Sequence, residues 1–86
     1  MIFAIYNGFS EVGRINGITR IRTLMEKVVD FMSRNDLRRC TVHQIRNGDF
    51  SGTIYDVWKT DGRFYYKTRD SLTHHQITVA PEVAVC

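Results

Sequence analysis

The chain has little cysteine, a single proline and no long apolar run. Its two cysteines, Cys40 and Cys86, are too few for the disulfide framework that holds small secreted domains together, so we expect a reduced, intracellular environment. No apolar stretch approaches the roughly 20 residues that a membrane-spanning helix needs. The apolar N-terminal residues have no basic region before them, which argues against a signal peptide. These absences predict a cytoplasmic protein.

The motifs of most enzyme classes are also missing. The glycines do not follow the spacing of a phosphate-binding loop, and no Gly-x-Ser-x-Gly nucleophile elbow occurs. Cys40 and His43 belong to an expected strand in which they point to opposite faces, and no spacing of Cys and His matches a zinc site. We therefore expect no metal and no cofactor.

The charge of the chain is mildly basic. Lys and Arg number 12 against 9 Asp and Glu, so the net charge is +3. This excess suits a nucleic acid or an acidic protein surface, and it excludes a protein that imitates nucleic acid. With 86 residues, of which 43% are hydrophobic, the chain is expected to form one domain over 1–86, whose small core a homodimer contact would help to stabilise.

The first half of the chain contains one helical pattern. Apolar residues recur at helical spacing over 18–32, which predicts a helix with Asn16 or Thr19 as its N-cap. Residues 2–6 are apolar on both faces, which predicts a central strand or an edge strand buried under the helix. The glycine-rich stretch 9–17 predicts a loop.

The stretch 53–69 predicts a β-hairpin. Two runs of β-branched and aromatic residues flank Asp61-Gly62, a dipeptide typical of hairpin turns. A two-residue turn places Trp58 opposite Tyr65, on the face away from the core. A three-residue turn with a bulge at Gly62 shifts the register by one and turns Trp58 into the core. We favour the second register, because a large indole is more often buried than exposed.

The remaining segments complete a small sheet. Residues 40–46 have no clearly apolar face, which favours an edge strand. A short strand is expected over 76–80, ended by Pro81, and the tail 81–86 is either a further edge strand or flexible. The expected fold is α+β, a small antiparallel sheet of four to five strands with one helix packed on one face, in the order β-α-β-β-β.

One face of the second hairpin strand is basic and aromatic in either register. Because side chains alternate along a strand, four residues share this face: Arg63, Tyr65, Lys67 and Arg69. Asp56, on the first hairpin strand, is expected to pair with a basic residue across the hairpin. The predicted binding surface consists of Arg63, Tyr65, Lys67, Arg69, Trp58, Arg38, Arg39 and Arg46.

This surface predicts a binding module that is not an enzyme. Basic side chains contact phosphates and aromatic rings stack on bases, so RNA is one expected partner. An acidic protein surface is the other, since Arg, Tyr and Trp are also the residue types enriched in protein–protein hot spots. A short single-domain chain with an exposed sheet and no cofactor motif is also the format of a small phage-type inhibitor of a host or defence enzyme.

A ribonuclease is the alternative function. RNA cleavage requires only a general acid, a general base and cations, and His74-His75 follow the basic strand. The meander SGTIYDVWKTDGRFYYKTRDSLTHHQITVA over 51–80 resembles the RelE/ParE-like toxin family, small basic proteins directed at the ribosome or gyrase. Within it, GRFYYKTRDSL is similar to the family's central strand and the acidic turn after it. The resemblance implies ribonuclease activity, and it implies two helices between the first two strands where the spacing predicts one.

Overall fold

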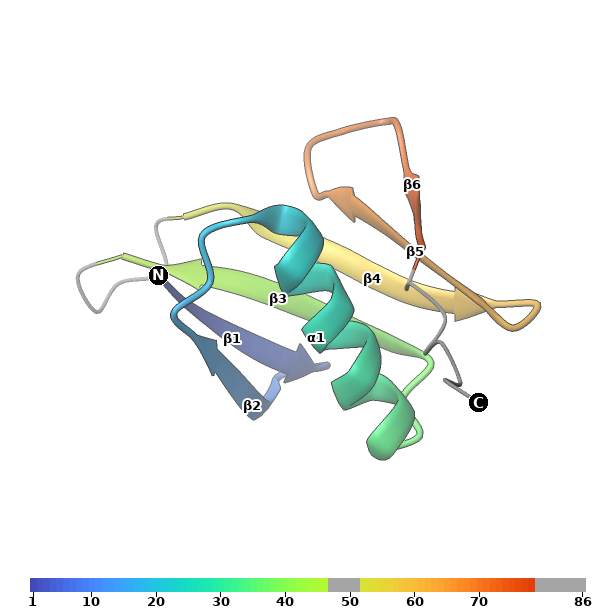
Figure 1. The fold of residues 1–86 in the computed structure, drawn as a ribbon, viewed down its shortest axis with the longest axis horizontal. Helices are drawn as coiled ribbons and strands as arrows, with labels where there is room; N and C mark the ends of the chain where they lie inside the picture. Colours follow the sequence, from blue (N-terminus) through green and yellow to red (C-terminus); the bar gives the residue numbers. More distant parts are fainter. Residues whose placement is uncertain (47–51, 79–86) are drawn as a thin grey trace, which may run out of the picture.

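The computed structural model describes residues 1–46 and 52–78, which form one antiparallel sheet with one helix across it (Figure 1). The elements are β1 (Ile2–Asn7), β2 (Ser10–Asn16), α1 (Ile21–Arg34), β3 (Arg39–Ile45), β4 (Ile54–Thr60), β5 (Arg63–Thr68) and β6 (His75–Ile77). The sheet order is β2-β1-β3-β4-β5-β6. The predicted α+β class is confirmed. The described residues form six strands, where four to five were expected.

Helix α1 begins later than its apolar spacing predicts. Ile18 is buried ahead of the helix, whereas Ile21, the first helical residue, is 47% exposed. The N-cap is Arg20, so both predicted caps are wrong. The buried stripe of the helix consists of Leu24, Met25, Val28, Val29 and Met32. It packs on one face of the sheet and forms the core with it.

The glycine-rich stretch after β1 forms strand β2, and the predicted loop is wrong. β2 pairs with β1 through a register that shifts between Ile5 and Tyr6, which marks a bulge. A Cβ at Gly13 would lie 2.7 Å from the ring of Phe31 on α1. Glycine at this position therefore allows Phe31 of the helix to pack closely against β2. Between residues 7 and 39, all of which the structure describes, there is one helix, not the two that the RelE/ParE-like resemblance implies.

Strand β3 lies inside the sheet, paired with β1 on one side and β4 on the other. Its predicted edge position is wrong, and Gln44 explains why. This buried side chain donates from Nε2 to the sulfur of Met1 at 3.1 Å and accepts from the backbone N–H of Thr53 at 3.3 Å. A polar group with hydrogen-bond partners is tolerated in the core, so β3 can be central without being uniformly apolar.

The β4–β5 hairpin has the two-residue turn. Asp61 and Gly62 both have positive φ, 51° and 76°, as a type I′ turn requires. Trp58 pairs with Tyr65 and lies on the face away from α1, so the favoured three-residue turn and the buried indole are wrong. The core position is taken by Val57, which is 0% exposed. Because alternate residues face opposite sides, burying Val57 turns Trp58 outward.

The predicted C-terminal strand is present as β6, which pairs with β5. Its expected extension to residue 80, its end at Pro81 and the tail 81–86 lie outside the described residues. In the part of the chain that the structure describes, no helix is long and apolar enough to cross a membrane.

Candidate functional site

The candidate site lies on the side of the sheet opposite α1, which we call the outer face. Among the described residues, no helix or strand covers this side (Figure 1). The strand pairings place outer-face residues of β3, β4 and β5 in rows across the sheet. The first row contains Arg39, Trp58 and Tyr65, and the second contains Thr41, Asp56 and Lys67.

Three aromatic rings, which we call the aromatic cluster, meet on the outer face. Trp58 and Tyr65 stack, with ring centroids 6.0 Å apart and ring planes 20° from parallel. The ring of His74, just before β6, lies 5.9 Å from that of Trp58 and 5.7 Å from that of Tyr65. Trp58 and Tyr65 are half-buried and His74 is exposed. The cluster therefore presents aromatic surface to solvent next to the basic residues.

Two of the predicted arginines border the aromatic cluster. Arg39 lies directly opposite Trp58 on β3, and Arg63 lies two residues before Tyr65 on the same face of β5. Both are exposed. Within residues 1–46 and 52–78, no carboxylate lies within ion-pairing distance of either guanidinium. Both charges are therefore available to a partner.

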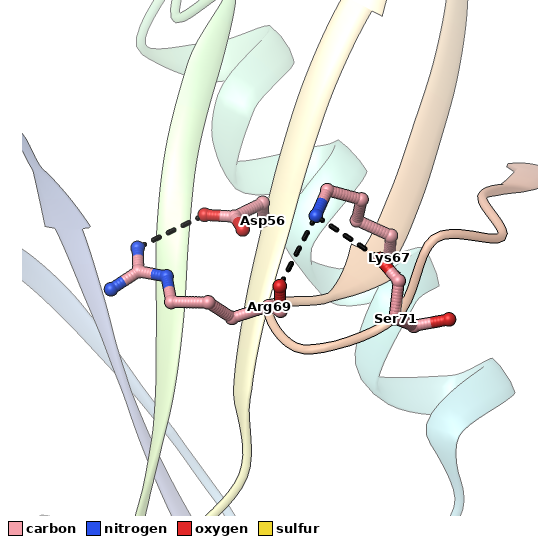
Figure 2. Close-up of polar contacts among 4 residues, drawn as sticks. All are labelled: Asp56, Lys67, Arg69 and Ser71. Carbon is pink, nitrogen blue, oxygen red and sulfur yellow. Dashed lines mark hydrogen bonds and ion pairs between the residues drawn. The ribbon is translucent and has the colours of Figure 1, made fainter.

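The other two basic residues of the hairpin are held by neighbours (Figure 2). Arg69 donates from Nη2 to Oδ1 of Asp56 at 3.1 Å, which confirms the expected cross-strand ion pair of Asp56. Lys67 lies directly opposite Asp56. Its ammonium donates to the carbonyl oxygens of Arg69 and Ser71, each at 3.3 Å. Lys67 thus fastens the turn after β5 while its charge stays on the outer face.

Arg38 and Arg46 lie apart from the aromatic cluster. Arg38 lines a cavity of about 440 Å³ between the end of α1 and the hairpin turn, with Met32 and Phe64. Arg46 follows β3 at the far rim of the sheet, seven residues from Arg39, which corresponds to about 23 Å along a strand. The structure therefore gathers six of the eight predicted residues on one face and separates these two.

A shallow depression of about 350 Å³ lies on the outer face beside the indole of Trp58. Its lining residues are Arg39, Cys40, Thr41, Asp56, Val57, Trp58 and Lys67. Cys40 and Val57 have their side chains in the core, so they contribute backbone to its floor. Thr41 and Asp56 were not predicted as site residues. Asp56 shares the face of Trp58 because the two are two residues apart on β4. The place of Thr41 depends on the β3–β4 register, which no local pattern reveals.

A second aromatic contact lies on the outer face, and no pattern in the sequence indicates it. The rings of Tyr6 and His43 have centroids 4.7 Å apart. Partial burial lowers the pKa of His43, the Arg69 guanidinium lowers it further, and the Asp56 carboxylate opposes both. The imidazole is therefore mostly neutral at pH 7. The pairing of β1 with β3 creates this contact from residues far apart in the chain.

The groups proposed for catalysis do not converge on one point. His74 belongs to the aromatic cluster, whereas the ring of His75 lies 5.4 Å from that of Tyr66, which packs against the core. Burial raises the pKa of the Cys40 thiol to about 12, so it is protonated at neutral pH. In the described ranges 1–46 and 52–78, no three side chains of His, Cys, Asp or Glu gather as metal ligands.

Comparison with protein-family models, with curated proteins and with solved structures finds no match to this chain. The function is therefore argued from the geometry and charge of the outer face.

Proposed function

We propose that this protein is a non-enzymatic module that binds single-stranded RNA on its outer face. The observation that supports the proposal best is the stacked pair of Trp58 and Tyr65, half-exposed between Arg39 and Arg63. Aromatic rings stack on the bases of an unpaired strand, and guanidinium groups contact the phosphates between them. An open sheet face suits splayed bases, whereas the bases of a duplex are stacked on one another and their faces cannot reach an aromatic ring.

The charge of the outer face favours an anionic partner. The strand pairings place four basic side chains there, Arg14, Arg39, Arg63 and Lys67, and two carboxylates, Glu11 and Asp56. Arg69, just after β5, adds a fifth basic side chain through its ion pair with Asp56. The carboxylates form ion pairs with Arg14 and Arg69. Three positive charges then remain, of which the exposed Arg39 and Arg63 would contact phosphates. An acidic protein surface would use the same charges, but it has no need of the depression beside the indole, so we favour RNA.

Intrinsic fluorescence tests the proposal directly, because Trp58 is the only tryptophan. Titration with a short single-stranded RNA is expected to quench Trp58 in a saturable way. With two phosphate contacts, from Arg39 and Arg63, log K should fall with log salt at a slope of about −1.4, at roughly 0.7 per contact on a single strand. Arg39→Ala should weaken binding and make the slope shallower by about 0.7.

Lys27→Ala is the matched control, because Lys27 is an exposed cation on α1, on the other side of the sheet. This variant has the same net charge as Arg39→Ala and is expected to bind like the wild type. Absence of saturable quenching at low salt would contradict the proposal. Equal losses in the two variants would show that net charge alone drives association. Binding of polyglutamate in place of RNA would indicate an acidic protein partner.

The same samples test the ribonuclease interpretation. We expect the RNA to stay intact during the titration, since His74 and His75 point to opposite faces. Cleavage on a denaturing gel that disappears when both histidines are replaced by Ala would instead establish the catalytic function.

A further inference from the structure

The depression beside Trp58 lies between two rows of outer-face residues. One row holds Arg39 and Trp58, and the next holds Thr41, Asp56 and Lys67. Residues i and i+2 of a strand stand roughly 7 Å apart on the same face, about the width of a nucleobase. A base held against the indole therefore points an edge toward Asp56 and Lys67.

The two charged groups of the second row retain unused hydrogen-bonding capacity. The ammonium of Lys67 has three donors, of which two go to the carbonyls of Arg69 and Ser71 (Figure 2). The carboxylate of Asp56 accepts one bond, from Arg69 to Oδ1, among the described residues. Since an ionised carboxylate has about four acceptor sites, most of its capacity remains. The pair thus offers one donor beside several acceptors.

We infer that this depression binds a guanine base. This inference rests on the proposed function and names the base that the same surface prefers. The Watson–Crick edge of guanine carries one acceptor, O6, followed by two donors, N1–H and the 2-amino group. O6 can accept from Lys67 while both donors reach the carboxylate of Asp56. Adenine and cytosine place an acceptor nitrogen beside their amino group, and uracil has a single N–H donor, so each matches the pair less well.

The position of Asp56 within a basic surface is consistent with this role. A carboxylate repels the phosphates that Arg39 and Arg63 would attract, so it does not help to bind the RNA backbone. It does select a base that carries two donors. Arg69 holds the carboxylate in place from the side, at 3.1 Å. Asp56 therefore acts in choosing the base, and the arginines act in binding the strand.

The test uses the full chain and a set of oligouridines that carry one central guanine, adenine, cytosine, inosine or uracil. Trp58 quenching should show the guanine oligonucleotide binding about 5- to 150-fold more tightly than the uracil one, as expected for a bidentate base contact. Inosine, which lacks the 2-amino group, should bind with intermediate affinity. Asp56→Asn replaces one acceptor oxygen by a donor and should make the guanine and uracil oligonucleotides bind equally.

Asp30→Asn is the matched control. Asp30 also forms an ion pair with an arginine at 3.1 Å, but on α1, so this variant should keep the guanine preference. Thermal melting checks that each variant is folded. If no oligonucleotide binds the wild type, both the proposed function and this inference fail. If all five bind equally, or if the preference survives in Asp56→Asn, the function stands and the guanine site is refuted.

Discussion

Trp58 and Val57 are neighbours on β4 whose side chains lie on opposite faces of the sheet, so alanine at each position separates binding from folding. Val57 is 0% exposed under α1, whereas Trp58 is half-buried and stacks on Tyr65. We expect Trp58→Ala to impair RNA binding and Val57→Ala to impair stability. Each substitution should therefore impair one of the two properties, affinity or stability, far more than the other.

The magnitudes follow from the surroundings of each side chain. Val57→Ala removes two methyl groups, worth about 0.8 kcal/mol each, and leaves a cavity, for a total of roughly 2–3 kcal/mol of unfolding free energy. That lowers Tm by roughly 10–20 °C in a domain of this size. Trp58→Ala loses a cross-strand ring pair worth about 0.2–1 kcal/mol of stability. It also loses base stacking worth about 1–3 kcal/mol, which raises Kd roughly 5- to 150-fold.

Affinity is best measured here by fluorescence anisotropy of a dye-labelled RNA, because Trp58→Ala removes the intrinsic fluorophore. Urea unfolding followed by circular dichroism gives the stability of the same samples. Wild-type affinity in Trp58→Ala would refute the assignment of the indole as a stacking platform. A loss of stability in Trp58→Ala as large as that in Val57→Ala would show that the indole serves the core. Reduced affinity in folded Val57→Ala would show that the two faces are not independent.

Three further predictions concern stability and reactivity. Gly52→Ala should cost roughly 1–3 kcal/mol in urea unfolding, because its Cβ would lie 2.6 Å from the Cβ of Gln44 and 2.8 Å from its carbonyl oxygen. Burial lowers the pKa of His43 below 6.5, so the unfolded chain binds more protons and stability should fall as pH drops below that value, less so in His43→Gln. In Cys86→Ser, alkylation of buried Cys40 should require unfolding and accelerate with urea.

Each of these has a contradicting outcome. Wild-type stability of Gly52→Ala would mean that the backbone at position 52 moves away from Gln44 at little cost. An identical pH dependence in wild type and His43→Gln would assign the loss of stability at low pH to other groups. Fast alkylation of Cys40 in the absence of denaturant would show that β3 opens readily in the folded protein.

Local patterns in the sequence correctly indicated the helix, the hairpin and the face of β5. Helical spacing and strand alternation arise from backbone geometry over a few residues, so they can be read without the rest of the chain. The same alternation predicted that Arg63, Tyr65 and Lys67 share one face, and the pairings of β5 agree. Strand β2 was missed because the bulge near Gly13 breaks its alternation and glycine disfavours strands.

The strand registers and the internal position of β3 were not readable from the sequence. Asp61-Gly62 is compatible with two turns, and only the packing of Val57 under α1 decides between them. That choice turns Trp58 outward and places Asp56 beside it on the outer face. Arg38 and Arg46 share the alternation of the buried Cys40, Val42 and Gln44, so they are excluded from the outer face once it is known which side of β3 packs under α1.

The sequence by itself determined that this is a small basic α+β protein with an aromatic, positively charged strand, because composition and alternation are local properties. The tertiary structure alone decided that Trp58, Thr41 and Asp56 line one depression with Lys67. Residues of three strands meet there, and which of them meet depends on contacts between α1 and the opposite face of the sheet.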